Sequence, residues 1–539
     1  MQRIYTDLED IMKKFSNFTD TLFRKNYSEF ILLFIFTLCY SLLFNAIDFI
    51  RYPVKSGNAI STILLFVLSI FLVYYFFLLA SINKILFNAT VIITTFISSI
   101  TLYYIILYKI RVYLLDTFIL LIQTNVHEAI GVISIDLIVF TCIITLFSIA
   151  FLYLYNKKLT YSSLKNKFIV IILLTPLLFS LYFSRPVMPY SFFYAVKMYK
   201  QYVNIINQPK TDISQFPSTF DEKKNKDLIV IFIIGEAARA DHFSINGYKR
   251  TTSPLIEQLQ VISLPNINSF FGVTNQAVPL MLTRATNKSF EIANKETSFI
   301  SIFNKHGFTT AWISNQDIID NSYSNISSFA NEAQILKQVI WNVSSKKDYS
   351  IINSKILDEN MLPSVDHLLT LPNRKLIVMH CMGSHWEFHK HYPDSFLKFT
   401  PPCTVRNVSR CKQDELINSY DNSILYVDYI ISEVIKRLLN KNAIVIYCSD
   451  HGEFLGEDGY YGHIPGISRK EITNPAMFVW MSSIYKKKNP EKYLNLIKNK
   501  DKNLPNYVLF HSILDAASID GTVVNKNLSI FSKMKINND

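Results

Sequence analysis

Cysteine is scarce in this chain, and its spacing excludes one class of zinc site. Six cysteines are spread over 539 residues, and no two of them are separated by two residues. With no CxxC pair and no nearby histidine to complete a tetrahedron, a structural zinc module is excluded. Cys403 and Cys411 nevertheless lie close together in the polar stretch PPCTVRNVSRC. In an oxidising compartment this pair predicts a disulfide.

Acidic residues are also few, and the sequence has no internal repeat. The chain has 42 Asp and Glu against 54 Lys and Arg, which gives a formal net charge of +12. Because the basic residues are scattered, this excess argues against nucleic acid as a partner. It indicates either attraction to anionic lipid headgroups or a lysine-rich solvated surface, as at residues 486–488.

Long hydrophobic runs, by contrast, are abundant. Half of the residues are hydrophobic, and the excess lies before about residue 185. A helical run of about 20 apolar residues is long enough to cross a bilayer. The sequence predicts five such runs, and the first starts too far from the N-terminus to be a cleavable signal peptide. The five runs are 29–47, 60–80, 85–108, 132–155 and 168–184.

Lysine and arginine in the short loops predict how these runs are oriented. Five lie in the flank before the first run and four in the loop after the fourth, whereas the two opposite loops hold two each. Basic loops stay on the cytoplasmic side, so the N-terminus is predicted to face the cytoplasm. Because five is an odd number, everything after the fifth run is predicted to lie outside.

Changes in the sequence pattern divide the chain into three parts. Residues 1–184 form the predicted five-helix transmembrane domain, and residues 185–226 form a linker whose aromatic start is predicted to lie on the membrane surface. In residues 227–539, the runs DLIVIFIIG, RKLIVMHCMG and NAIVIYCSD alternate with helical stretches such as QDELINSYDNSILYVDYIISEVIKRLLN. Such β-branched runs are typical of strands covered on both faces, which predicts an α/β sandwich with a parallel sheet.

Each of these three predicted strands ends in residues that can bind a metal. In open α/β sheets, ligands bind outside the carboxyl ends of the strands. A mixed set of carboxylates and imidazoles favours zinc, with manganese as the second choice, and three protein ligands would leave one position for catalysis. A single Asp or His after a strand is more often a turn residue, but three strands ending this way favour a site. The residues are Glu236, His380, His385, Asp450, His451 and His463.

Four hydroxyl side chains in SFFGVTNQAVPLMLTRAT are candidate nucleophiles, and their spacing alone does not choose between them. Thr274 is favoured because it follows Gly272 in a predicted loop before a helix. A helix N-terminus favours the negative charge of a phosphoryl group. The other candidates are Ser269, Thr283 and Thr286.

These motifs together resemble those of the phosphoethanolamine transferases, bacterial membrane enzymes of the alkaline phosphatase and sulfatase superfamily. The resemblance rests on GEAARADHFSINGYKRTTSPLI, GVTNQAVPLMLTRAT, HCMGSH, SYDNSILYVDYII and SDHGEFLGEDGYYGH, and it covers nearly the whole chain. It implies an alkaline phosphatase-like α/β/α sandwich behind five transmembrane helices. It also implies an inner-membrane location with the catalytic domain in the periplasm.

The resemblance assigns roles to individual residues. The metal-binding acid of the family's GETARA-like motif falls on Glu236. The threonine nucleophile, which also binds the metal, lies five residues before a proline and falls on Thr274. The remaining zinc ligands fall on Asp450 and His451. The family's substrate-side histidines, which can hold a second zinc, match His380, His385 and His463, and His380 is the implied proton-transfer group.

Two further pairs are implied as substrate contacts. Thr124 and Glu128, in LIQTNVHEAIG, resemble the family's membrane-proximal donor-binding pair, and their spacing puts both on one helix face. The polar face of an ordinary interfacial helix is the alternative. Asn315 and Gln316, after the run TTAWIS, are expected either to line the substrate pocket or to form a plain loop.

The implied activity is transfer of phosphoethanolamine from phosphatidylethanolamine to lipopolysaccharide, lipid A or another envelope glycan. A zinc-dependent enzyme with a covalent phospho-threonine intermediate is expected, with membrane lipids as further partners. The sequence departs from the family at Ala237, Trp386 and Glu387, and only one disulfide is available, which leaves the acceptor open. The alternatives are a glycerol-phosphate transferase that uses phosphatidylglycerol, and a phosphodiesterase. A non-catalytic scaffold is disfavoured because the whole ligand set is present.

Overall fold

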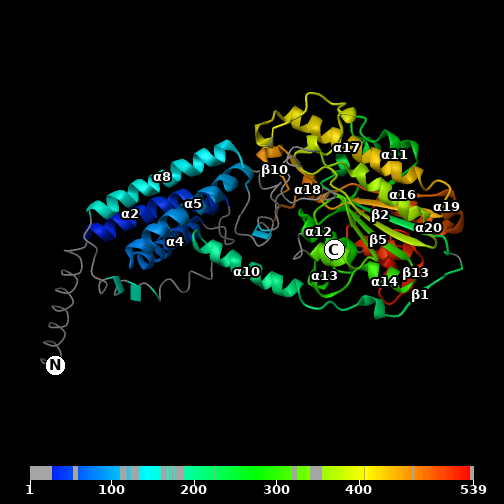
Figure 1. Ribbon diagram of the computed structural model, residues 1–539, viewed down its shortest axis with the longest axis horizontal. Coiled ribbons are helices and arrows are strands. Elements are labelled where there is room, and N and C mark those ends of the chain that lie inside the picture. The colour runs from blue at the N-terminus through cyan, green and yellow to red at the C-terminus, as the bar shows by residue number, and fades with distance from the viewer. Residues whose placement is uncertain are drawn as a thin grey trace. The chain divides into compact units, whose positions relative to one another are not determined.

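The computed structural model describes residues 27–534, apart from 52–58, 110–117, 120–121, 123–132, 159–166, 169–170, 173–174, 176–186, 224, 319–324, 340–354, 406 and 464–465. The chain forms two compact units (Figure 1). One comprises residues 1–119 and 133–199, and the other comprises residues 120–132 and 200–539.

The first unit is helical in its described residues. Three of its helices are long and apolar enough to cross a membrane, over Ala59–Ala80, Lys84–Leu107 and Ile135–Lys157, and Glu29–Phe44 is a shorter apolar helix. The fifth predicted run, 168–184, lies largely outside the described residues, so the count of five stays a prediction. The described helices of this unit are α2 (Tyr27–Phe44), α3 (Ala46–Arg51), α4 (Ala59–Ala80), α5 (Lys84–Tyr108), α8 (Ile135–Lys158) and the first part of α10 (Tyr190–Ile206), which continues into the second unit.

The second unit is built on a seven-stranded sheet with the order β3-β11-β8-β2-β7-β5-β6. The strands from β8 to β6 are parallel, and β11 and β3 add an antiparallel edge. The three strands that the sequence predicts are the central ones of this sheet. Their bounds are β3 (Ile262–Ser263), β11 (Met477–Met481), β8 (Ala443–Ser449), β2 (Ile229–Gly235), β7 (Lys375–His380), β5 (Thr309–Ser314) and β6 (Ile335–Gln338).

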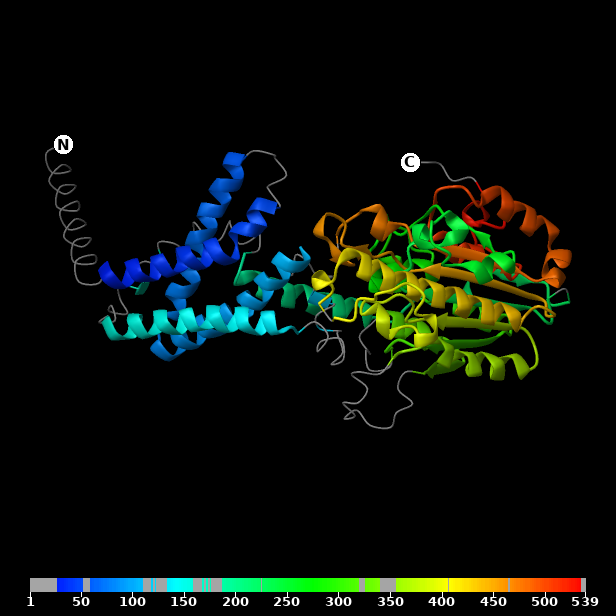
Figure 2. The ribbon, with the colours of Figure 1, turned by 90° about the horizontal axis from the view of Figure 1, so that it is seen from above.

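The side chains of β2 point alternately to the two faces of the sheet, and each face is covered by a layer of helices. Val230, Phe232 and Ile234 belong to one buried core with α12 (Thr274–Leu282), α14 (Phe299–Lys305) and α21 (Val508–Ala516). Ile229, Ile231 and Ile233 belong to a second core with α11 (Pro254–Gln258), α16 (Leu362–Thr370) and α17 (Gln413–Lys436). Successive side chains of a strand point to opposite faces, so a fully apolar strand needs a helical layer on both. The predicted α/β sandwich is confirmed (Figure 2).

Shorter elements complete this unit. Three pairs of short strands lie outside the main sheet: β1 (Ser218–Phe220) with β13 (Ile519–Gly521), β9 (Phe454–Leu455) with β10 (Tyr461–Gly462), and β4 (Ile267–Asn268) with β12 (Leu504–Pro505). In the described part of this unit, the remaining α-helices are α13 (Ile292–Lys295), α15 (Asn325–Ala330), α18 (Lys470–Thr473), α19 (Ser483–Lys488) and α20 (Pro490–Asn499). The predicted disulfide between Cys403 and Cys411 is present, with the two Cα atoms 5.8 Å apart.

Candidate active site

Three candidate ligands meet at the carboxyl ends of two neighbouring strands. Glu236 follows β2, and Asp450 and His451 follow β8. The register pairs Gly235 with Ser449, the last residues of these two strands. All three ligand side chains are buried, with at most 2% of the residue exposed. The strand order therefore brings together residues that are more than 200 positions apart in the sequence.

Thr274 lies beside this group as the first residue of α12. Its hydroxyl Oγ1 donates to Glu236 Oε2 over 3.2 Å and lies 3.4 Å from His451 Nε2. The residue is half-buried. Val273, the N-cap of this nine-residue helix, makes no side-chain hydrogen bond to the first turn. A negative charge that develops on this hydroxyl therefore faces a helix N-terminus, which stabilises it.

The other three candidate hydroxyls are hydrogen-bonded within their own segments. Ser269 donates to the carbonyl two residues later over 2.9 Å, and Thr283 donates to the carbonyl four residues earlier over 2.7 Å. Thr286 shares a hydrogen bond of 2.8 Å with the hydroxyl three residues later. Of the four, the structure brings Thr274 alone within hydrogen-bond distance of Glu236 and His451 among the described residues.

The two carboxylates share an arrangement in which one oxygen is held and the other is left without a hydrogen bond. Glu236 Oε2 accepts from Gln316 Nε2 over 3.0 Å as well as from Thr274. Asp450 Oδ1 accepts from the backbone N–H groups of Ala237 and His451, over 3.2 Å and 2.7 Å. Among the described residues, Glu236 Oε1 and Asp450 Oδ2 are buried with no hydrogen-bond partner. Buried acceptors of this kind are costly unless a cation binds them.

The backbone fixes the imidazole of His451 in one tautomer. Its Nδ1 lies 2.8 Å from the carbonyl oxygen of Gly452. A carbonyl can only accept, so Nδ1 carries the proton and Nε2 presents its lone pair. Nε2 lies 3.4 Å from Glu236 Oε1 and 3.4 Å from Asp450 Oδ2. A ring held through its second nitrogen in this way is typical of metal-binding histidines.

These separations fit a tetrahedral metal ion. With metal–ligand distances of about 2.1 Å, the ligands of a tetrahedral ion lie about 3.4 Å apart. Burial, followed by the nearby carboxylate of Asp450, raises the pKa of Glu236 well above its ordinary value. A positive charge beside the buried Glu236 carboxylate would favour its ionised form. The donor set and its unpartnered oxygens thus fit a metal ion.

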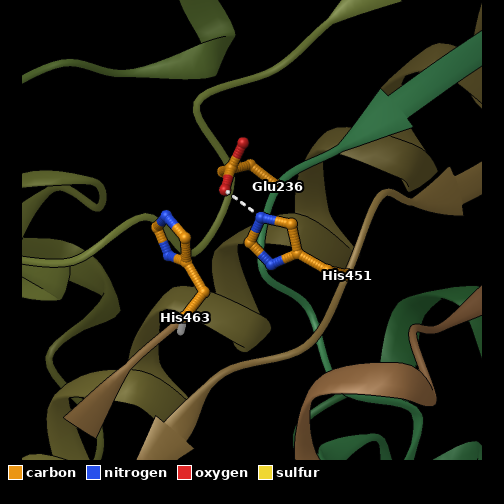
Figure 3. A group of neighbouring side chains, drawn as sticks. All are labelled: Glu236, His451 and His463. Atoms are coloured by element: carbon orange, nitrogen blue, oxygen red, sulfur yellow. Dashed lines mark ion pairs between the residues drawn. The ribbon is translucent and has the colours of Figure 1, made fainter. Parts of the chain in front are cut away.

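His463 is half-buried and lies beside this group. Ligand atoms of Glu236, His451 and His463 all lie within 4.8 Å of one another (Figure 3). The rings of His451 and His463 are 4.6 Å apart, and His385 lies 6.2 Å from His463. Glu453, 1% exposed, accepts from Nδ1 of His463 over 3.3 Å. The predicted histidines 385 and 463 therefore lie together, next to the carboxylate group.

Glu453 orients His463, and sequence reasoning missed it. It lies in the motif SDHGE, two residues after His451, so its position beside the ligands was a signal that could have found it. A carboxylate hydrogen-bonded to a histidine fixes the ring and strengthens it as a ligand.

His380 is the last residue of β7 and lies deeper in the protein. It is 1% exposed, and neither ring nitrogen has a hydrogen-bond partner among the described residues. Burial lowers the pKa of His380 to about 4, so the ring is neutral at pH 7. Its ring packs edge-on against Trp312, 5.8 Å away. Its predicted role in proton transfer stays a prediction.

The predicted pair after β5 separates into two environments. Asn315 is 1% exposed, and its amide donates to Asp358 Oδ1 over 2.8 Å. Gln316 is half-buried and donates to Glu236 Oε2 and to the carbonyl of Cys381, over 3.0 Å and 2.9 Å. Gln316 thus contacts the ligand group directly, whereas Asn315 contacts it through other residues. The predicted donor-binding pair, Thr124 and Glu128, lies outside the described residues.

Comparison with known proteins decides the family. Residues 229–519, which include the whole candidate site, match the family model described as Sulfatase. The chain belongs to the sulfatase family. Within this sulfatase-family chain the match begins at β2 and ends in β13.

Relatives of this sulfatase-family protein are phosphoethanolamine transferases, which confirms the resemblance seen in the motifs. EptA of Escherichia coli K12 is 30% identical over 290 residues, 51% of this chain and 50% of the relative. Mcr-1 of E. coli, a phosphatidylethanolamine transferase, is 31% identical over 269 residues, 47% of this chain and 48% of the relative. The chain thus spans about half the length of the first curated relatives it matches. EptA of Helicobacter pylori is 27% identical over 511 residues, 88% of this chain and 92% of the relative.

Solved structures agree with the fold. The integral membrane protein EptA of Neisseria meningitidis superposes with a TM-score of 0.77 at 22% identity, covering 94% of this chain and 98% of the other. The C-terminal periplasmic domain of EptC from Campylobacter jejuni gives a TM-score of 0.52 at 27% identity, covering 61% of this chain and 100% of the other. The two-part architecture of this sulfatase-family chain is therefore shared with a transferase that is a membrane protein.

Proposed function

We propose that this protein transfers phosphoethanolamine from phosphatidylethanolamine to lipopolysaccharide, lipid A or another envelope glycan. The observation that carries the proposal is the position of Thr274. Its hydroxyl lies at a helix N-terminus and within 3.4 Å of both Glu236 and His451. The names of the relatives, which include a Kdo(2)-lipid A phosphoethanolamine 7''-transferase of E. coli K12, support the class of group transferred and of acceptor.

The proposed location follows from the apolar helices and the charge of the loops. Residues 1–184 form a multi-pass domain with five helices in the bacterial inner membrane, and the aromatic start of the 185–226 linker lies on its outer surface. Residues 227–539 form the catalytic domain in the periplasm. The long apolar helices α4, α5 and α8 and the disulfide between Cys403 and Cys411 support this arrangement.

Zinc is the proposed metal, held by Glu236, Asp450 and His451 with Thr274 as the fourth ligand. Mixed oxygen and nitrogen donors at tetrahedral spacing support zinc over magnesium or calcium, which prefer oxygen ligands. When bound, the ion supplies positive charge that lowers the pKa of the hydroxyl and neutralises charge on the phosphoryl group. His385 and His463 are proposed to hold the phosphoryl oxygens or a second zinc.

The reaction proceeds in two displacements at Thr274. In the first, the Thr274 O–H bond breaks, Oγ1 bonds to phosphorus, and the bond from phosphorus to the diacylglycerol oxygen breaks. The hydrogen bond to Glu236 Oε2 gives the hydroxyl proton an acceptor, and diacylglycerol leaves with a proton. In the second, an oxygen of the acceptor hydroxyl or phosphate bonds to phosphorus, the bond from phosphorus to Thr274 Oγ1 breaks, and Oγ1 takes up the proton that the acceptor oxygen loses. Dividing one hard transfer into two steps is the advantage of a covalent intermediate.

The remaining predicted residues take supporting roles. His380, neutral at pH 7, is proposed to relay a proton between steps. Thr124 and Glu128 are proposed to bind the donor headgroup near the membrane. Asn315 donates to Asp358 and precedes Gln316, and it is proposed to contribute to substrate binding from this position.

Peptide mass spectrometry tests this proposal. Purified protein is incubated with phosphatidylethanolamine and zinc but without acceptor. The expected result is a phosphoethanolamine mass increment on Thr274 and release of diacylglycerol, both absent in Thr274→Ala. An unmodified Thr274 without diacylglycerol release would refute the donor. A glycerol-phosphate increment from phosphatidylglycerol would instead establish the alternative transferase, and diacylglycerol release without any adduct would favour a phosphodiesterase.

A further inference from the structure

Asp358 is a buried carboxylate that is not one of the candidate metal ligands. It begins the short 3₁₀ turn Asp358–Met361 and is 4% exposed. It accepts three hydrogen bonds: from Asn315 Nδ2 over 2.8 Å, from the backbone N–H of Met382 over 2.8 Å, and from that of Gly383 over 2.9 Å. Two separate segments of the chain, one after β5 and one after β7, are thus joined through one side chain.

The segment after β7 forms a turn that packs directly on the backbone of Glu236. Ser384 N–H donates to the carbonyl of Glu236 over 2.9 Å. Gly383 has a φ of +51°, and a Cβ atom there would lie 2.8 Å from the Glu236 carbonyl oxygen. The turn therefore has almost no freedom of position next to Glu236. Its backbone N–H groups at 382 and 383 are fixed by Asp358.

The segment after β5 contacts the carboxylate of Glu236. Asn315, held by Asp358, is followed by Gln316, whose amide donates to Glu236 Oε2 and to the carbonyl of Cys381. Cys381 begins the turn that Asp358 holds from the other side. The segment after β7 thus contacts the backbone of Glu236, and the segment after β5 contacts its side chain. Asp358 is the group that they share.

We propose that Asp358 is a positioning residue for the metal site, which fixes the backbone and the side chain of Glu236 so that Oε1 points at the metal. This inference rests on the proposed function, because it takes Glu236 as a metal ligand. A buried carboxylate that merely filled space could be replaced by an apolar group at little cost. Three hydrogen bonds to two segments instead give it a geometric role, and outer partners of this kind tune metal affinity.

Zinc affinity of the full-length protein in detergent tests the proposal. Asp358→Asn keeps the size of the side chain but turns one acceptor oxygen into an N–H donor that faces other donors. Zinc affinity is measured by competition with a chromophoric chelator, together with the thermal unfolding midpoint. Asp366→Asn is the matched control, because the Asp366 carboxylate is 54% exposed on α16 and pairs with Arg437 at the surface.

The expected result is a zinc affinity about 10- to 100-fold lower in Asp358→Asn and unchanged in Asp366→Asn. The visible spectrum of the cobalt-substituted protein, which reports ligand geometry, should change in Asp358→Asn alone. Wild-type zinc affinity and an unchanged cobalt spectrum in folded Asp358→Asn would overturn the inference while leaving the proposed function intact. If Asp358→Asn does not fold, Asn315→Ala decides: reduced affinity supports the proposal and wild-type affinity overturns it. Wild-type protein that binds no zinc would refute the metal centre itself.

Discussion

Replacing Gly383 with alanine should destabilise the fold and weaken the metal site together. The residue lies at φ +51°, in the left-handed region, which costs an L-residue about 1–2 kcal/mol. The added Cβ would also lie 2.8 Å from the carbonyl oxygen, 2.9 Å from the amide nitrogen and 3.2 Å from the Cβ of Glu236. Overpacking of this kind costs about 1–3 kcal/mol. The total expected loss of stability is therefore about 2–5 kcal/mol.

Gly247→Ala separates the two contributions. Gly247 also has a positive φ, +91°, but a Cβ there would meet nothing within 4 Å. Its substitution should cost about 1–2 kcal/mol through the backbone alone and should leave the site unchanged. The difference between the two variants then measures the contact with Glu236.

The assay pairs denaturant unfolding of the two full-length variants with zinc competition. Gly383→Ala should be about 1–3 kcal/mol less stable than Gly247→Ala and should bind zinc at least about tenfold more weakly. Equal stability losses with equal zinc affinity would refute the reasoning, because the turn after β7 would then tolerate movement without moving Glu236.

Two further predictions concern a neighbour of the metal ligand and a histidine remote from it. Gln316→Leu removes the amide that donates to Glu236 Oε2 and should lower zinc affinity about 10- to 100-fold in the chelator assay. The control Gln258→Leu, on the exposed end of α11, should leave zinc affinity unchanged. Equal zinc affinities of the two variants would contradict the role of the amide. Burial lowers the pKa of His511 to about 4, and its Nδ1 accepts from the backbone N–H of Asn525. The unfolded state binds a proton on His511 more tightly than the folded state does. The contribution of His511 to the free energy of unfolding is therefore fully present above about pH 6.5. It falls by up to about 3 kcal/mol as the pH falls towards 4. His511→Asn should therefore flatten the stability profile between pH 6.5 and 4 in denaturant titrations, and a profile as steep as that of the wild type would contradict the assignment.

The central strands and the ligands after them could be predicted because both leave a local signature. A buried parallel strand reads as a continuous apolar run, and a charged residue directly after it marks the end of the sheet where ligands gather. Glu236 and Asp450 follow this rule. The sandwich and the disulfide were predicted in the same way, from runs and spacing.

Asp358 and Gln316 show what such reasoning does not reach. Asp358 accepts hydrogen bonds from backbone N–H groups, which every residue type except proline offers, so no pattern in the sequence identifies its partners. Gln316 was singled out for the pocket, but its contact with Glu236 depends on how β5 and β2 are placed around β7. Long-range contacts between loops follow from the assembled sheet and not from local propensity.

The two halves of the metal site differ in how they are assembled. Asp450 accepts from the N–H of the next residue and from that of Ala237, and His451 bonds to the carbonyl of the residue after it, so this half takes most of its geometry from three consecutive residues. Glu236 instead depends on contacts with segments that follow β5 and β7. During folding, the first half requires its own segment and the pairing of β8 with β2, whereas the second also requires β5 and β7 to be in place. Tight metal capture should therefore come late in folding, after the central strands have paired.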